Sequence, residues 1–201
     1  MPEPRLSTLQ FILARMYNWH RVDEGLYRSA QMYGGCSATL LMAHGIVSVI
    51  NLRGENPDST WYLPERDTCT LLGIDYINRP LHSRRLPKRE MLLRLIEAFR
   101  TAEGPILIKC SGGADRTGLA AAIYLLNKNG PTALEAARRQ MAFLPYLHLP
   151  KRHQRWIRRF LDFFEVDHAG LSIADWARLS YAPDRFADWL LTNKFGGTWV
   201  P

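Results

Sequence analysis

Cys110 and Arg116 stand six positions apart in the stretch PILIKCSGGADRTG, residues 105–118. A thiolate is a strong nucleophile, and a planar guanidinium can hold two oxygens of one phosphoryl group, which a lysine cannot do in the same way. A thiol and an arginine at this spacing could therefore take a phosphoryl group from an ester onto sulfur.

The sequence around this pair predicts the elements that would position it. The apolar run PILIKC predicts a buried strand, residues 117–129 predict a helix, and a short loop joins them. The N–H groups of such a loop converge at the helix N-terminus, where an anion binds and the thiolate is favoured over the thiol. Gly112 and Gly113 suit the loop, because glycine adopts the backbone angles that inward-pointing amides require.

This loop resembles the signature of the protein tyrosine and dual-specificity phosphatases, in which Cys and Arg at this spacing are followed by Ser or Thr, here Thr117. The segments GLYRSAQ (25–31) and VINLRGE (49–55) are similar to bacterial dual-specificity-like members, so the resemblance spans roughly residues 22–145. The loop CSGGADRT is also similar to the CSxGxDRT loop of the myotubularin-like phosphoinositide phosphatases. The alternative is a buried structural cysteine beside an unrelated surface arginine.

The resemblance implies hydrolysis through a phosphocysteine intermediate, with no metal ion and no cofactor. Cys110 would attack phosphorus, while Arg116 and the loop amides would hold the equatorial oxygens. Thr117 would donate a hydrogen bond to the departing thiolate; the alternative is that its hydroxyl is an ordinary helix N-cap. The predicted phosphate loop comprises Ser111, Gly112, Gly113, Ala114, Asp115 and Arg116.

The general acid departs from the usual family pattern. Most members carry an Asp shortly after the strand that matches residues 74–78, whereas residues 80–87, PLHSRRLP, contain no carboxylate. Asp115 is the first candidate, because some relatives use the aspartate of an AspArgThr sequence as the acid; the alternative is a structural carboxylate that bonds the loop or Arg116. Two other candidates are His82, since an ordinary histidine pKa of about 6.5 suits proton donation, and Asp58, on the loop after the strand at 46–52.

Lys109 is a second departure, because the family usually has His immediately before the nucleophile. The lysine either supports the thiolate electrostatically or points away from it.

The order of predicted elements indicates an α/β fold. Strands expected at 26–28, 46–52, 74–78 and 106–109 alternate with helices expected at 38–44, 63–72, 90–102, 117–129 and 132–141. This alternation predicts a mainly parallel central sheet flanked by helices, as the family resemblance also implies. We expect residues 1–150 to form the phosphatase domain, including an amphipathic N-terminal helix at 6–17, and residues 151–201 to form a helical C-terminal extension packed on it.

Charge indicates an anionic partner. The net charge is +7, and two clusters hold many of the basic residues. The clusters are Arg79, Arg84, Arg85, Lys88, Arg89 and Arg94, and Lys151, Arg152, Arg155, Arg158 and Arg159. A phosphorylated protein or an anionic phospholipid fits this charge, whereas no sequence signature supports specific nucleic-acid binding. For the second cluster, a solvated helix face is an equal alternative.

Cysteine usage and hydropathy bear on location. Three irregularly spaced cysteines make neither a disulfide framework nor a zinc site, and a reactive thiolate favours a reducing compartment, so a cytoplasmic location is expected. The N-terminus has no cleavage site typical of a signal peptide, and the longest uncharged stretch, residues 29–52, is broken by polar residues and glycines. No transmembrane segment is predicted, which leaves peripheral contact with a membrane open.

Three functions remain in view. The first is a cysteine-dependent phosphatase of the dual-specificity or tyrosine type that acts on phosphoproteins. The second is the same chemistry on a phosphoinositide or another phospholipid head group. The third is a phosphate-binding module without turnover; the presence of Cys110, Arg116 and Thr117 together argues against it, because binding alone needs no thiol.

Overall fold

The computed structural model describes residues 4–198, which form two compact units. The first unit contains residues 4–80 and Thr101–Gly113, and the second contains Leu81–Arg100 and residues 114–198. The chain passes from the first unit to the second between Gly113 and Ala114.

The first unit holds a five-stranded sheet in the order β1-β2-β5-β3-β4. Its strands are β1 (His20–Asp23), β2 (Leu26–Ser29), β3 (Ser48–Asn51), β4 (Asp75–Asn78) and β5 (Ile106–Lys109). β1 pairs with β2 antiparallel, and the other three pairings are parallel. The predicted mainly parallel sheet is confirmed. β1 was not predicted, because its sequence HRVD has no apolar alternation and each of its residues is only half-buried.

Register brings the ends of the central strands together. Ser29 of β2 and Asn51 of β3 both lie opposite Lys109, the last residue of β5. The loops that follow these three parallel strands therefore leave the sheet at one edge, the usual place for a ligand site in an α/β sheet. Cys110 begins one of these loops, and the loop after β3 carries Asp58, as predicted.

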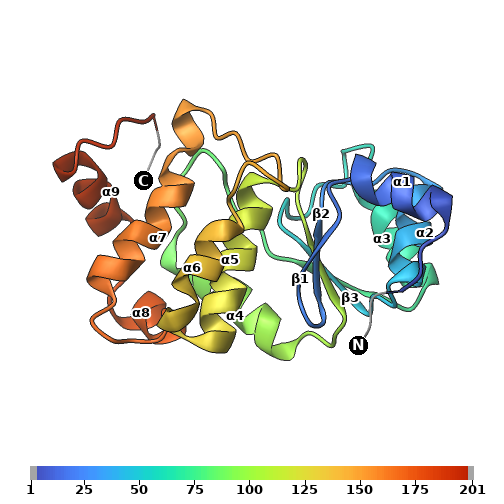
Figure 1. Ribbon diagram of the computed structural model, residues 1–201, viewed down its shortest axis with the longest axis horizontal. Helices are drawn as coiled ribbons and strands as arrows, with labels where there is room; N and C mark the ends of the chain where they lie inside the picture. The colour runs from blue at the N-terminus through green and yellow to red at the C-terminus, as the bar shows by residue number, and fades with distance from the viewer. Residues whose placement is uncertain (1–3, 199–201) are drawn as a thin grey trace. The chain divides into compact units, whose positions relative to one another are not determined.

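Three helices cover one face of this sheet (Figure 1). They are α1 (Thr8–Met16), α2 (Gly35–Ala43) and α3 (Tyr62–Leu71). Ser7 begins α1 with a capping box, in which its hydroxyl accepts from Gln10 N–H and the Gln10 side chain accepts from Ser7 N–H. The buried cluster between helices and sheet includes Leu13, Trp19, Tyr27, Leu40, Leu41, Val49 and Leu107.

The second unit, as far as the structure describes it, is helical. Its elements are α4 (Arg89–Thr101, of which the last residue falls in the first unit), α5 (Asp115–Asn129), α6 (Leu134–Arg139), α7 (Trp156–Asp167), α8 (Ile173–Leu179) and α9 (Pro183–Thr192), with short 3-10 turns at Pro131–Ala133 and Arg152–Gln154. α5 contacts α6, α7 and α8, and α9 contacts α7 (Figure 1). Ser172 caps α8 through a hydrogen bond from Asp175 N–H to its hydroxyl. The helical nature of the tail is confirmed, while the boundary at residue 150 stays a prediction.

One predicted helix is much shorter than expected. The pattern at 132–141 becomes a 3-10 turn followed by α6, which ends at Arg139. The Met141 carbonyl accepts from the His148 ring and from Arg158 instead of from a further helical turn. Residues 142–150 consequently form an irregular segment that returns to α7. None of the helices described over residues 4–198 is long and apolar enough to cross a bilayer.

A buried charged pair joins β5 to α3 in the first unit. The Lys109 ammonium contacts the Glu65 carboxylate and lies 3.0 Å from Gln31 Oε1, and Tyr76 donates to Glu65 at 2.6 Å. Burial lowers the pKa of Lys109 to about 8, against the opposing effect of Glu65. The charge of Cys110, just after β5, also acts to raise the pKa of Lys109. Which of the two alternatives holds for Lys109 therefore stays a prediction.

We predict that Glu65→Gln destabilises the protein by about 3 kcal/mol, because it leaves a buried ammonium without its counter-charge. The double variant Glu65→Leu/Lys109→Met should recover much of this loss. Urea denaturation measures both, with Asp67→Asn as the control on the same helix, since Asp67 pairs only with its neighbour Arg66 at the surface. An equal loss in Glu65→Gln and Asp67→Asn would contradict the structural role of the pair.

Candidate active site

Three successive carbonyls of the phosphate loop are tied back to the first unit. Ser111 O accepts from Gln31 N–H at 3.1 Å, and Gly112 O accepts from the Asn18 amide at 3.3 Å. Gly113 O accepts from the Arg28 guanidinium at 2.8 Å. In a trans peptide the C=O and N–H point in opposite directions, so the N–H groups that follow these carbonyls face the other way. This is the arrangement that an anion-binding loop requires.

Gly113 is the residue that lets the loop lie so close to β2. Its φ is +66°, a conformation that side chains disfavour. A Cβ atom at this position would lie 2.6 Å from Ala30 N and 2.7 Å from Ser29 C, which are backbone atoms that cannot yield. No other type of residue fits here without moving the loop or the strand.

Arg28 and Asn18 hold the loop from behind. Arg28 is fully buried, so its charge acts in a region from which water is excluded. Asn18 Oδ1 lies 2.8 Å from His20 Nε2. Burial, with Arg28 and Arg15 nearby, lowers the pKa of His20 to about 4. A neutral His20 can donate to Asn18 Oδ1, which orients the Asn18 amide to donate to Gly112.

Cys110 lies at the base of this loop. It is 2% exposed, whereas Ser111 and Gly112 are exposed. The loop amides turn towards one side of Cys110, and a substrate would reach the thiol from that side.

The remainder of the loop leads into the first turn of α5. The helix begins at Asp115 with Ala114 as its N-cap, so the alternative that Thr117 is the N-cap is wrong. The Thr117 hydroxyl is buried and forms no hydrogen bond with any described protein group. Its predicted role towards the thiolate stays a prediction.

Asp115 has two partners that the sequence analysis did not find. Gln154 donates to Asp115 Oδ2 at 3.0 Å, and His148 Nε2 lies 3.1 Å from Asp115 Oδ1. The latter contact is within ion-pair distance but is bent away from a straight hydrogen bond. His148 Nδ1 lies 2.9 Å from the Met141 carbonyl, which can only accept, and 3.4 Å from Arg158 Nε, which can only donate. In the tautomer that accepts from Arg158, the hydrogen is on Nε2, which then faces Asp115 Oδ1.

The other two candidates for the acid are less well supported. His82 is exposed as a residue, but the partial burial of its ring lowers its pKa, and the positive charges of Arg85, Arg116 and Lys88 lower it further. The neutral ring is thus favoured, which weakens His82 as a proton donor at neutral pH. Asp58 is exposed on its loop, and no hydrogen bond holds it in the part of the chain that the structure describes.

The comparison with family models decides the family. A model described as the tyrosine phosphatase family matches residues 17–129, more than half of the chain. The chain belongs to the tyrosine phosphatase family. The matched span includes all five strands, the whole phosphate loop and α5.

A curated relative in the family is the dual specificity protein phosphatase TpbA of Pseudomonas aeruginosa (strain UCBPP-PA14). It is 32% identical over 130 residues, which are 61% of this chain and 54% of that protein. The chain therefore spans about half the length of this relative.

Solved phosphatase structures share the fold. The crystal structure of P. aeruginosa TpbA superposes with a TM-score of 0.60 at 23% identity, over 82% of this chain and 91% of that one. The core catalytic domain of the PP-IP phosphatase SIW14 from S. cerevisiae gives 0.52 at 23% identity, over 74% and 88%. PTPMT1 in complex with PI(5)P gives 0.54 at 14% identity, over 74% and 97%.

Sequence signals for the supporting residues differ in strength. Arg28 lies in the GLYRSAQ segment. It is a charged residue within a buried four-residue strand, and such a residue normally has a specific partner. His148 and Gln154 lie 33 and 39 positions after Asp115, outside any motif, and only the folded chain brings them together.

We predict that Gly113→Ala lowers phosphatase activity about a hundredfold, because an added Cβ displaces the loop amides. Gly112→Ala is the matched control: its Cβ would meet nothing within 4 Å, and its φ is not positive. Turnover of an aryl phosphate and inhibition by inorganic phosphate report on the loop, and circular dichroism reports on the fold. Comparable activity in the two variants would show that close approach at Gly113 is not required.

Proposed function

We propose that this member of the tyrosine phosphatase family is a metal-independent cysteine phosphatase that works through a phosphocysteine intermediate. The single observation that carries the proposal is the set of loop carbonyls tied away from the loop interior. Such a loop presents amides to the three equatorial oxygens of a phosphoryl group in the transition state. A thiol at the base of an anion site is suited to attack, whereas pure binding needs no thiol.

In the first step, the Cys110 thiolate attacks phosphorus in line and the bond to the leaving oxygen breaks. Arg116, on the first turn of α5, would hold two phosphoryl oxygens with its guanidinium. The loop amides and the positive end of α5 stabilise the same charge. Thr117 would donate to the sulfur when the thiolate departs in the second step.

Asp115 is the proposed general acid, and it gives its proton to the leaving oxygen as the ester bond breaks. His148 and Gln154 are its positioning residues: Gln154 donates to one carboxylate oxygen, and His148 Nε2 lies 3.1 Å from the other. In the second step the Asp115 carboxylate takes a proton from the attacking water, which releases phosphate and regenerates the thiolate. After one turnover, Asp115 again carries its proton and Cys110 is again a thiolate.

The proposed substrate class is a phosphoprotein of the tyrosine or dual-specificity type. The curated relative is named a dual specificity phosphatase, and a Cys-to-Ser form of TpbA has been crystallised in complex with pTyr. A phosphorylated inositol or phospholipid head group is the second candidate. The exposed cations Arg84, Arg85 and Lys88 favour a substrate with additional negative charge.

We predict that the purified protein releases phosphate from an aryl phosphate without added metal, and that Cys110→Ser abolishes the release while retaining phosphate binding. Cys36→Ser is the matched control, because Cys36 lies on α2, outside the loop, and should keep full activity. Phosphate release in the presence of a chelator is the measurement. Turnover retained in Cys110→Ser would rule out the covalent mechanism, and binding without turnover by the unaltered protein would identify a phosphate-binding module.

We predict that Asp115→Asn slows an alkyl phosphate about a hundredfold but an aryl phosphate much less, since a good leaving group needs no proton. His148→Gln should show the same asymmetry and a shifted pH profile, whereas His153→Gln, a half-buried histidine in the same stretch, should match the unaltered enzyme. Steady-state kinetics on the two substrates measure the ratio. Equal slowing of both substrates by Asp115→Asn would exclude it as the acid.

A further inference from the structure

The segment between α6 and α7 has an inverted pattern of burial. Leu147 is 60% exposed and Leu149 is 72% exposed, whereas His148 between them is fully buried. Phe143 and Leu144, earlier in the segment, are 49% and 70% exposed. Leucine and phenylalanine are normally inside and histidine is normally nearer the surface, so this arrangement needs a reason.

Half of the reason is the contact of His148 with Asp115. His148 is turned inward, while Leu147 and Leu149 on either side of it are turned outward. The other half is the backbone at Leu147, which has a φ of +55° and donates its N–H to Phe143 O at 2.5 Å. A positive φ is unfavourable for leucine, and asparagine or glycine would be the inexpensive choice. A large apolar side chain is thus held outward at a cost in backbone energy.

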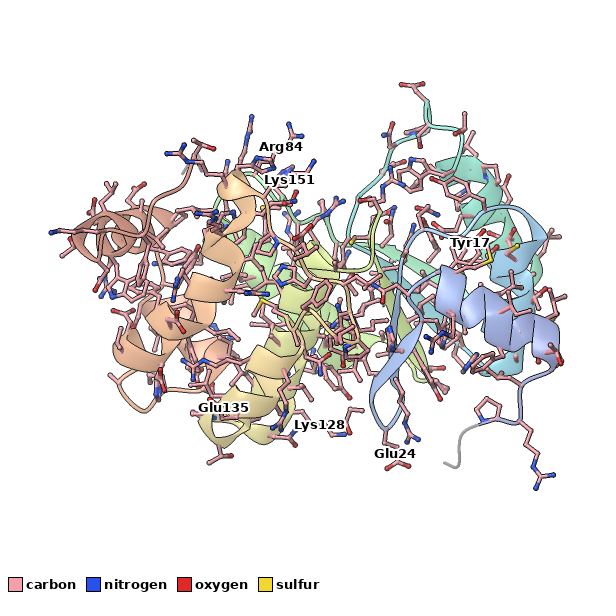
Figure 2. The ribbon with its side chains drawn as sticks, turned by 45° about the horizontal axis from the view of Figure 1, so that its top comes forward. Tyr17, Glu24, Arg84, Lys128, Glu135 and Lys151 are labelled. Atoms are coloured by element: carbon pink, nitrogen blue, oxygen red, sulfur yellow. The ribbon has the colours of Figure 1, made fainter. Side chains whose placement is uncertain are left out.

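Cations surround these outward side chains. Residues 136–161 contain seven lysines and arginines and no carboxylate. Lys151, Arg152 and Arg155 are exposed and follow the segment directly. Figure 2 shows Lys151 at the same end of the second unit as Arg84, with Lys128 and Glu135 at the opposite end. The Trp156 indole donates to Ser83 O at 3.2 Å, which ties the Arg84 loop to the start of α7.

A basic hollow lies beside the segment within the second unit. Its volume is about 890 Å³, and Phe143 and Pro150 form part of its wall. The charged residues around it are Arg138, Arg155, Arg158, Arg159, Lys194 and Asp162. Arg138 and Arg159 pair with Asp162, and Arg138 also pairs with Glu135 and Glu165, so the positive charge of the hollow comes mainly from Arg155, Arg158 and Lys194.

We propose that residues 142–150 dock on an anionic lipid bilayer, with Phe143, Leu144, Leu147 and Leu149 entering the interface. The neighbouring cations and the hollow would receive lipid phosphates. Each Lys or Arg near an anionic surface contributes roughly 1 kcal/mol, and the buried apolar side chains add to this. Docking on this surface can be tested without substrate.

A lipid surface fits the segment better than a protein partner does. Phe143 and Leu144 are adjacent in the chain, and Leu147 and Leu149 flank the buried His148, so the four exposed apolar side chains are spread along an irregular stretch beside the cations. A fluid interface accepts separate apolar side chains beside cations, whereas a protein partner needs a complementary shape. Docking would also bring the segment that carries His148, and with it the acid Asp115, close to the membrane surface.

The test is sedimentation of the full chain with vesicles of phosphatidylcholine alone or with 30% phosphatidylglycerol, at about 0.05 and 0.5 M salt. We expect binding only to the anionic vesicles and mainly at low salt. Lys151→Gln/Arg152→Gln should weaken binding about thirtyfold, which corresponds to roughly 1 kcal/mol for each cation. Leu147→Asn/Leu149→Gln should weaken it at least about tenfold, and Asn suits the positive φ at residue 147.

The controls separate docking from folding and from turnover. Leu179→Ser removes an equally exposed leucine, 67% exposed on α8, and should bind vesicles as the unaltered chain does. Cys110→Ser should also bind fully, so failure of the chemistry and failure of docking are distinguishable. No binding to anionic vesicles, or loss with the charge variant but not with the leucine variant, would overturn the proposal. A leucine variant that changes only the oligomeric state would assign the segment to self-association and would overturn it equally.

Discussion

The direction in which the loop carbonyls point is the constraint on which the site depends. Three donors from residues 18–31 each capture one carbonyl of residues 111–113. Without them, a loop rich in glycine would sample many conformations, and its amides would converge only part of the time. Arg28 lies on β2, Gln31 follows β2, and Asn18 lies between α1 and β1. Because β2 pairs with β5, the loop is anchored to the strand that leads into Cys110. Preorganisation is thus built into the sheet rather than into the loop itself.

The proposed acid, Asp115, has an environment that the sequence could not reveal. Asp115 stands beside Arg116 in the chain, yet its hydrogen-bonding partner Gln154 and its ion-pair partner His148 both come from the segment that ends at α7. A side chain held by those partners has a fixed direction.

The sequence was sufficient for the parts of the fold that depend on local pattern. Residues 106–109 form the strand as predicted, because a short apolar run followed by a glycine-containing loop is typical of a buried strand. β1 was missed because its half-buried residues carry no period, and the helix predicted at 132–141 was too long because its end depends on His148 and Arg158. Lys109 shows the same limit: its burial against Glu65 depends on a contact across 44 residues. A local sequence pattern predicts helices and strands, whereas contacts between residues far apart in the chain are known only from the structure.

One short segment combines two requirements that normally conflict. A buried histidine beside a carboxylate favours an inward turn at residue 148, while Leu147 and Leu149 on either side of it are turned outward. Polar residues at both positions would be better solvated, and asparagine at position 147 would adopt the positive φ at a lower energy. Stability alone therefore does not explain the leucines. Proteins commonly retain local strain and exposed apolar groups where function needs them. Because these leucines flank the residue that positions the proposed acid, an interface that holds the segment in place would act on the same contact that orients Asp115. Residues 142–150 thus carry both His148, which positions the proposed acid, and the apolar side chains proposed to dock on a membrane.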